Sequence, residues 1–488
     1  MSISAEQRAG LLEAAVVLVG AIAVAGLVLV PRAGLFAVIG CVTLWFVALA
    51  YDALRARLDG LMLCWILGFP FGYTVLSFPQ ESSIVTLDRV VILIAFTGVA
   101  LFKPNSLMAV PKALRRAGLA WLAFLVVAIV SLRNVHDVLT PAHLLFDGFL
   151  LPLLLGWAVV AKFDVRRRLT TIHTAVCVSS IVCAAMAVVE MATGQDLLPT
   201  NYSGMYFAGT IPRPNGPFAF DVDLATVGIV SFFFLLFLRA VLGPKLSAGR
   251  RMLHWIGLTA TIGMSLMPMF RSIAITLLLA LIIDTLWQQR STRNSWRVVL
   301  LFVIVGMIFV APFLLPQSMI ENRSSSGNVY GRVAQFEASL RVIEDHPLLG
   351  VGFANFGKFV MGEPRYVASY DGVSSVGTPH NNLTEALAET GILGFVPYVM
   401  IQVLLSMAMW QLRRSSSSGS LVWRYYIYVF LSFWITGLTE STAFSPLTVW
   451  YVFVVAVFYK YAMTGPDSRH LVEALACAEV FAGPAHVF

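Results

Sequence analysis

Repeated apolar runs, each long enough to cross about 30 Å of lipid hydrocarbon, divide this sequence from end to end. Backbone polar groups find no water in that layer, and helices satisfy them internally. The sequence therefore predicts an all-α, polytopic membrane protein with about 12–14 transmembrane helices and one large loop that contains short helices. The runs centre near Ala23, Thr43, Phe69, Ala95, Phe124, Leu153, Val182, Ser231, Ile262, Leu278, Val305, Val399, Phe430 and Val454.

Composition excludes the other broad classes. With 58% hydrophobic and 12% charged residues over 488 positions, the chain is not a soluble globular domain. The net charge of +7 does not indicate nucleic-acid binding, because the basic residues form short clusters between apolar runs. The five cysteines show neither a disulfide framework nor metal-ligand spacing. We expect no nucleic-acid partner, no metal and no cofactor.

The basic clusters also predict the topology. If both termini are cytoplasmic, most of the 33 lysines and arginines fall in inside loops, as the positive-inside rule requires. The predicted organisation has four parts: membrane helices at 1–315, about eleven, with an outside loop at 190–223; a large outside loop at 316–383; about three membrane helices at 384–463; and a cytoplasmic tail at 464–488.

The large loop contains one amphipathic segment. Its apolar residues recur at helical spacing, with polar residues on another face. We expect a helix that ends before Pro347 and lies on the membrane surface, apolar side down. The apolar positions are Val333, Phe336, Leu340 and Ile343, and the polar ones are Arg332, Gln335 and Ser339.

The loop closes on a histidine at a predicted helix start. Thr378 is a suitable helix cap and Pro379 suits the first helical position, so His380 would lie in the first turn. The helix dipole there disfavours imidazolium and keeps a neutral base available. Glu385 and Glu389 follow one turn apart at the entry to an apolar run, where an unpaired carboxylate is costly.

Several motifs carry a resemblance to a known family. His-Pro-Leu-Leu-Gly-Val-Gly-Phe-Ala-Asn-Phe at 346–356, Pro-His-Asn-Asn-Leu at 379–383 and Glu-Thr-Gly-Ile-Leu-Gly at 389–394 resemble the O-antigen ligase and polymerase superfamily. Arg213-Pro-Asn-Gly-Pro-Phe resembles that family's Arg-x-x-Gly-x-Phe segment. Arg271 and Arg332 resemble its arginines at a membrane-helix start and upstream of the first motif.

The resemblance implies an activity and a location. It implies a multi-pass protein of the bacterial inner membrane that transfers a glycan from an undecaprenyl-diphosphate carrier to an acceptor hydroxyl on the periplasmic face. The reaction would need no metal and would invert the anomeric centre. The acceptor would be a lipid A-core sugar for a ligase, or another carrier-linked repeat unit for a polymerase. Surrounding membrane lipids are the remaining expected partners.

The same resemblance assigns roles to residues. Without a bound cation, arginines must neutralise the leaving diphosphate, and a neutral histidine can accept the acceptor's proton. The candidates are His380 as base; Arg213, Arg271 and Arg332 for the diphosphate; Arg341 to extend that anion site; and Asn381, Glu385 and Glu389 to orient His380 or to bind sugar hydroxyls.

Other interpretations remain open. An arginine at a membrane-helix end is commonly an interface anchor, and a charge on an amphipathic helix commonly marks its solvated face. A lipid-linked oligosaccharide flippase, or another secondary transporter, would also have many helices, with ionisable residues lining a path through the membrane. Here Asp147, Glu190 and Asp284 lie near the ends of apolar runs, which favours the enzyme.

Overall fold

The computed structural model of the chain describes residues 46–55, 57–72, 84–198, 206–208, 211–243, 246–287, 326–370, 372–374, 379–415, 418–440 and 447–464, together with 74, 77, 78 and 377. The centres of three predicted membrane runs, Ala23, Thr43 and Val305, lie outside these residues, as does Thr378. Every other predicted centre falls within a helix.

The described residues are almost entirely helical. Before the large loop the helices are α3 (Asp59–Gly68), η1 (Phe69–Phe71), α4 (Leu87–Phe102), α5 (Pro104–Met108), α6 (Lys112–Ser131), η2 (Leu132–Asn134), α7 (Leu139–Leu145), η3 (Phe146–Leu150), α8 (Leu151–Lys162), α9 (Val165–Thr193), α10 (Asp221–Leu242), α11 (Ala248–Leu266) and α12 (Arg271–Trp287). From the large loop onward they are α15 (Ser326–Asp345), α16 (Phe356–Gly362), η5 (Pro364–Tyr366), α17 (Asn382–Ser415), α18 (Gly419–Gly437) and α19 (Leu447–Met463).

Three short antiparallel hairpins complete these elements. They pair β1 (Ser77–Phe78) with β2 (Val85–Thr86), β3 (Tyr206–Ala208) with β4 (Ile211–Arg213), and β5 (Ser369–Tyr370) with β6 (Val373–Ser374). Each hairpin lies in a connection between helices, so the sheet pairs shape loops and leave the helical core unchanged.

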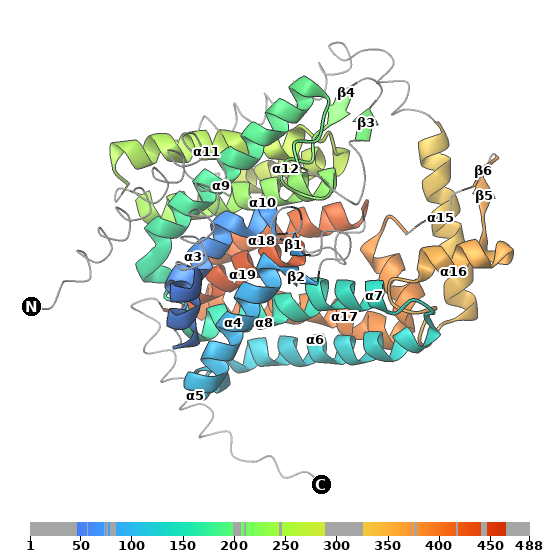
Figure 1. Cartoon of the computed structure of the whole chain (residues 1–488), viewed down its shortest axis with the longest axis horizontal. Coiled ribbons are helices and arrows are strands. Elements are labelled where there is room, and N and C mark those ends of the chain that lie inside the picture. The colour runs from blue at the N-terminus through green and yellow to red at the C-terminus, as the bar shows by residue number, and fades with distance from the viewer. Residues whose placement is uncertain are drawn as a thin grey trace, which may run out of the picture.

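The protein is an all-α, polytopic membrane protein. Within the part of the chain that the structure describes, five helical segments are long and apolar enough to cross a membrane, and three shorter apolar helices accompany them. The five are Lys112–Asn134, Leu139–Lys162, Val165–Thr193, Asp221–Leu242 and Asn382–Arg414. The long helices run side by side, and α15, α16 and the β5–β6 hairpin lie beyond one end of them (Figure 1).

We call this end the loop end; α9, α11 and α18 finish there, and α10, α12 and α17 begin there. One buried ion pair stabilises the helices close to it. Arg89 of α4 donates from Nε and Nη2 to the two carboxylate oxygens of Asp147, at 2.7 and 2.6 Å. Both side chains are buried, so the two-bond geometry offsets the cost of removing two charges from water.

Two of the sequence motifs interlock at the loop end. Helix α17 is interrupted at Gly391, whose φ of 61° and ψ of −171° are open essentially to glycine alone. The turn at 347–352 supplies partners for the interrupted backbone, because Ile392 N–H donates to the Pro347 carbonyl at 2.8 Å and Gly352 N–H donates to the Glu389 carbonyl at 2.9 Å. The turn also reaches the membrane helices, where Phe353 is buried against Phe124 and Phe149. The turn therefore packs back on the membrane domain.

Replacing Gly391 by alanine is expected to destabilise this junction. A Cβ there would overlap the Leu348 carbonyl, and the backbone conformation would be strained as well. We expect a loss of about 2–3 kcal/mol, seen as a fall of about 4 °C or more in the thermal unfolding midpoint in detergent. Gly362→Ala is the matched control, because a Cβ at Gly362 meets nothing within 4 Å. Equal midpoints for the two variants would contradict the interlocked junction.

Helix α15 ends at Asp345, which confirms the predicted stop before Pro347. It packs on the rest of the loop through a face of small and polar residues, so Gln335 and Ser339 are buried although the sequence placed them on a polar face. The buried apolar residues of α15 are Ala334, Ala338 and Val342, and they share a cluster with Val351, Phe356, Val360 and Tyr366 of the following loop. The predicted apolar face is exposed at Val333, Phe336 and Leu340, and its contact with lipid stays a prediction.

Candidate active site

One carboxylate joins two of the predicted site residues. Glu440, just beyond the end of α18, lies 3.0 Å from Arg332 Nη2 through Oε1 and 3.0 Å from His380 Nδ1 through Oε2. The three residues come from α15, the segment before α17 and the end of α18, which are far apart in sequence. The backbone N–H of Glu440 donates to the Thr436 carbonyl at 2.9 Å, so the carboxylate is held on the last turn of the helix.

This contact fixes the imidazole. A carboxylate oxygen accepts hydrogen bonds, so the contact at Nδ1 requires the proton there and leaves the Nε2 lone pair of neutral His380 available. The side chain of Glu440 is 17% exposed, whereas those of His380 and Arg332 are 39% and 51% exposed. A shielded carboxylate thus contacts an imidazole and a guanidinium that are both more exposed than it is.

The helix start differs from the prediction. Helix α17 begins at Asn382, and its cap is Asn381, whose Oδ1 accepts from the backbone N–H groups of Leu383 and Thr384 at 2.9 and 3.4 Å. His380 therefore lies before the cap and outside the first turn. Asparagine is a stronger cap than threonine, which explains the shift along the chain. The prediction that Thr378-Pro379 starts the helix was wrong, and Glu440 rather than the helix dipole is the group that faces the imidazole.

Arg213 forms a second cluster. Its Nη2 lies 2.7 Å from Asp221 Oδ2, its Nε donates to the Pro268 carbonyl at 2.9 Å, and its guanidinium lies 4.4 Å from the Phe270 ring centroid. With its side chain only 18% exposed, Arg213 ties the start of α10 to the turn between α11 and α12.

Arg271 is the exposed first residue of α12 and follows directly on the segment that Arg213 holds. Within that segment Met269 has a φ of 62°, a conformation that costs free energy for a residue other than glycine. Arg213, Pro268 and Phe270 thus determine where the helix that carries Arg271 begins.

The two clusters lie at the same end of the bundle and at a similar level. Ring contacts pair Phe233 with Tyr428 at 5.3 Å and Phe237 with Tyr425 at 5.8 Å, so α10 and α18 are antiparallel. Asp221 lies about three turns before Phe233, and Glu440 lies about three turns after Tyr428. Each carboxylate is therefore about 18 Å from the paired rings along its helix axis, in the same direction, so the two lie at a similar level.

The remaining candidates have structural partners. Glu389 is buried and accepts from the backbone N–H groups of Ala354 and Phe356 at 2.7 and 3.2 Å, so it holds the 347–356 turn. Glu385 is buried one turn earlier on α17. Arg341 pairs with Glu337 at 2.6 Å and donates to the Arg365 carbonyl at 3.3 Å, so the structure does not bring it to Glu440.

The Arg213 motif is held in the same way as the turn at 347–356. Glu190, at the end of α9, accepts from the backbone N–H groups of Asn215 at 3.0 Å, Gly216 at 2.6 Å and Leu197 at 3.3 Å. Each motif loop is thus fixed by one buried carboxylate from a long membrane helix.

Comparison with known proteins gives one match. Residues 257–399 match the family described as O-antigen ligase. The matched segment runs from α11 into α17 and contains Arg271, Arg332 and His380, while Arg213 precedes it. The match covers 143 of the 488 residues. It confirms the resemblance found in the sequence and supports a membrane glycan enzyme of the O-antigen ligase or polymerase type. A search of curated proteins finds no match.

Proposed function

We propose that this protein transfers a glycan from an undecaprenyl-diphosphate carrier to an acceptor hydroxyl at the periplasmic face of a bacterial inner membrane, without a catalytic metal and with inversion. The observation that carries the proposal is the shared contact of Glu440 with Arg332 and His380. It places a cation suited to a diphosphate beside a base suited to an alcohol, at the end of the bundle where the family motifs lie.

The transfer step needs two groups. His380 Nε2 takes the proton of the acceptor hydroxyl as its oxygen bonds to the anomeric carbon of the donor sugar. The bond from that carbon to the phosphate oxygen breaks, and the electron pair leaves with the carrier diphosphate. Glu440 stabilises the imidazolium that forms, because its carboxylate lies 3.0 Å from Nδ1. Attack opposite the leaving group inverts the anomeric centre.

Arginines bind the leaving group. Arg332 uses Nη2 for Glu440, and its half-exposed side chain leaves other N–H donors for phosphate oxygens. Arg271 adds a guanidinium at the start of α12, where the helix dipole favours an anion. Arg213 does not bind the diphosphate itself, because Asp221 and the Pro268 carbonyl already occupy its Nη2 and Nε. It positions the start of α12, which carries Arg271.

A groove between α17 and α18 supports a lipid-linked donor. It has a volume of about 710 Å³, begins at Leu383 three residues after His380, and continues along the membrane part of both helices. Hydrocarbon binds such an apolar channel, and a polyprenyl chain entering it would leave its diphosphate near His380. The lining residues are Leu383, Phe395, Val399, Gln402, Val403, Ser406, Met407, Trp410, Gln411, Trp423, Phe430 and Trp434.

Arg332→Ala is expected to reduce kcat/KM by about 10²-fold, because one charge-assisted contact to the leaving diphosphate is lost. Arg332→Lys is expected to recover only part of this loss, because lysine cannot hold Glu440 and a phosphate with one planar group. Lys358→Ala is the control, since Lys358 is an exposed cation of the same loop that pairs with Asp137 at 2.9 Å. Equal losses of kcat/KM in the Lys358 and Arg332 variants would show that the overall positive charge of the loop, and not a specific site, determines the rate.

A deletion strain tests the reaction class. Without the protein, a polymerase leaves single repeat units on the carrier, whereas a ligase leaves full chains there. Complementation with wild-type protein should clear either intermediate, and His380→Gln should not. If carrier-linked glycan accumulates only on the cytoplasmic face in the deletion strain, the protein is a flippase and the proposal fails.

A further inference from the structure

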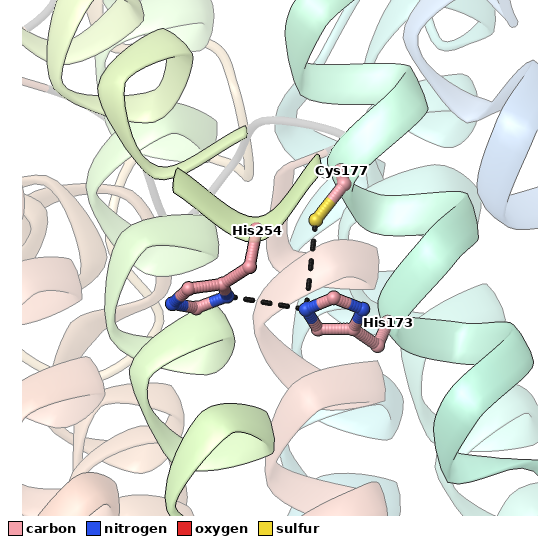
Figure 2. A group of neighbouring side chains, drawn as sticks. All are labelled: His173, Cys177 and His254. Carbon is pink, nitrogen blue, oxygen red and sulfur yellow. Dashed lines mark hydrogen bonds between the residues drawn. The ribbon is translucent and has the colours of Figure 1, made fainter. Parts of the chain in front are cut away.

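Three metal-ligating side chains converge in the membrane domain, away from the transfer site. His173 Nε2 lies 3.1 Å from His254 Nδ1 and 3.8 Å from Cys177 Sγ, and the three ligand atoms all lie within 4.8 Å of one another. Figure 2 shows the sulfur and both ring nitrogens directed to one place between α9 and α11. His173 lies about 25 Å along α9 from Glu190, toward the end of the bundle opposite the loop end.

The backbone brings these groups together. His173 and Cys177 are four residues apart on α9, so they share one helix face. Helix α11 can approach that face because Gly257 lies one turn after His254; a Cβ at Gly257 would come within 2.9 Å of the Cys177 sulfur. The close approach of the two helices is centred on the three ligands.

Burying this cluster in a membrane domain costs free energy, which a bound ligand would offset. All three side chains are at most 1% exposed, so their ligand atoms are removed from water. Polar groups buried in a membrane domain without full hydrogen bonding cost free energy, and they commonly mark function.

The spacing suits one ion with three ligands. With metal–nitrogen bonds of about 2.0 Å and a metal–sulfur bond of about 2.3 Å, ligand atoms around a trigonal ion lie about 3.5–3.8 Å apart. The distance between the two ring nitrogens would widen from 3.1 Å, the distance of 3.8 Å to the sulfur already fits, and all three atoms lie within 4.8 Å of one another.

Charge selects the kind of ion. Two neutral imidazoles and one thiolate carry a single negative charge, so a monovalent ion gives a neutral buried site and a divalent ion leaves a net positive charge. Burial makes such an uncompensated charge costly. Thiolate and imidazole are also the soft ligands that Cu(I) prefers.

We propose that His173, Cys177 and His254 bind one cuprous ion that links α9 to α11. The Cys177 thiol releases its proton as the sulfur–copper bond forms. The histidines stay neutral and carry their protons on His173 Nδ1 and His254 Nε2. No change of oxidation state is involved, and the site is separate from the transfer reaction.

Anaerobic titration of the full-length protein in nanodiscs tests this, with Cu(I) supplied from a competing chelator. We expect one equivalent of copper, an X-ray absorption spectrum fitted by two nitrogens and one sulfur, and a raised unfolding midpoint on binding. His254→Gln and Cys177→Ser should each weaken binding at least tenfold. Cys183→Ser is the matched control, because Cys183 is a buried free cysteine on the same helix outside the cluster.

Two results would overturn the proposal. The first is that the wild-type protein does not retain copper, or that its spectrum shows no sulfur ligand. This result is obtained with the wild-type protein alone and does not depend on the folding of any variant. The other is unchanged affinity in the His254 and Cys177 variants. Zinc retained in preference to Cu(I) would overturn the choice of ion.

Discussion

Replacing His380 by glutamine is expected to lower kcat by about 10³-fold, while the protein still folds and still binds its donor. Glutamine keeps a polar group near Glu440 but cannot accept a proton from the acceptor hydroxyl. A positioned general base contributes about 10²–10⁴-fold to a rate. Since diphosphate binding depends on arginines, KM for the donor should change little. The measurement is steady-state transfer by purified protein in nanodiscs.

His346→Gln is the matched control for this variant. His346 is also a loop histidine, and its Nε2 lies 3.3 Å from the Tyr366 hydroxyl, with no contact to Glu440. We expect nearly wild-type activity from it. Equal losses of kcat in the two variants, or a His380 variant that keeps most of its kcat, would show that His380 is not the general base.

Replacing Glu440 by glutamine is expected to lower kcat by about 10²–10³-fold. His380 and Arg332 meet different oxygens of Glu440, so an amide would turn an NH2 donor toward one of these two N–H groups. The variant loses the negative charge that stabilises the developing imidazolium, and the ring can adopt the other tautomer. Most of the loss should appear in kcat, and some in KM for the donor as Arg332 moves.

Two comparisons isolate the role of Glu440. Glu337→Gln changes an exposed acid that pairs with Arg341 and should leave transfer nearly unchanged. The double variant with His380→Gln should lose little more than His380→Gln alone, because residues that act as one unit are not additive. Fully additive losses would show that Glu440 and His380 act independently.

The membrane fold could be predicted from the sequence because hydrophobic length alone determines a spanning helix. The centres near Phe124, Ser231 and Val454 fall in α6, α10 and α19. The start of α17 was misplaced since two capping residues compete locally, and the asparagine is the one that bonds to the helix. The buried face of α15 was misplaced because it packs through Ala334 and Ala338, which a search for large apolar residues ignores.

The site could be predicted only in part. His380 and Arg332 belong to local motifs, whereas Glu440 stands alone in the sequence after an apolar run and comes to them only through the return of α18. Asp221 lies outside the Arg213 motif at 213–218 and is joined to Arg213 only in the folded chain. The cysteines showed no metal-ligand spacing by themselves, because His254 joins His173 and Cys177 only when α11 packs on α9. In each case the missing signal is a tertiary contact.

The most direct test of the account is transfer by the purified protein with a defined lipid-diphosphate-linked glycan and an acceptor, in the presence of a chelator of divalent cations. The anomeric configuration of the product is read by NMR. We predict that wild-type protein forms product with the inverted configuration and that His380→Gln and Glu440→Gln form almost none. Product of retained configuration, loss of wild-type activity in the chelator, or undiminished transfer by either variant would contradict it.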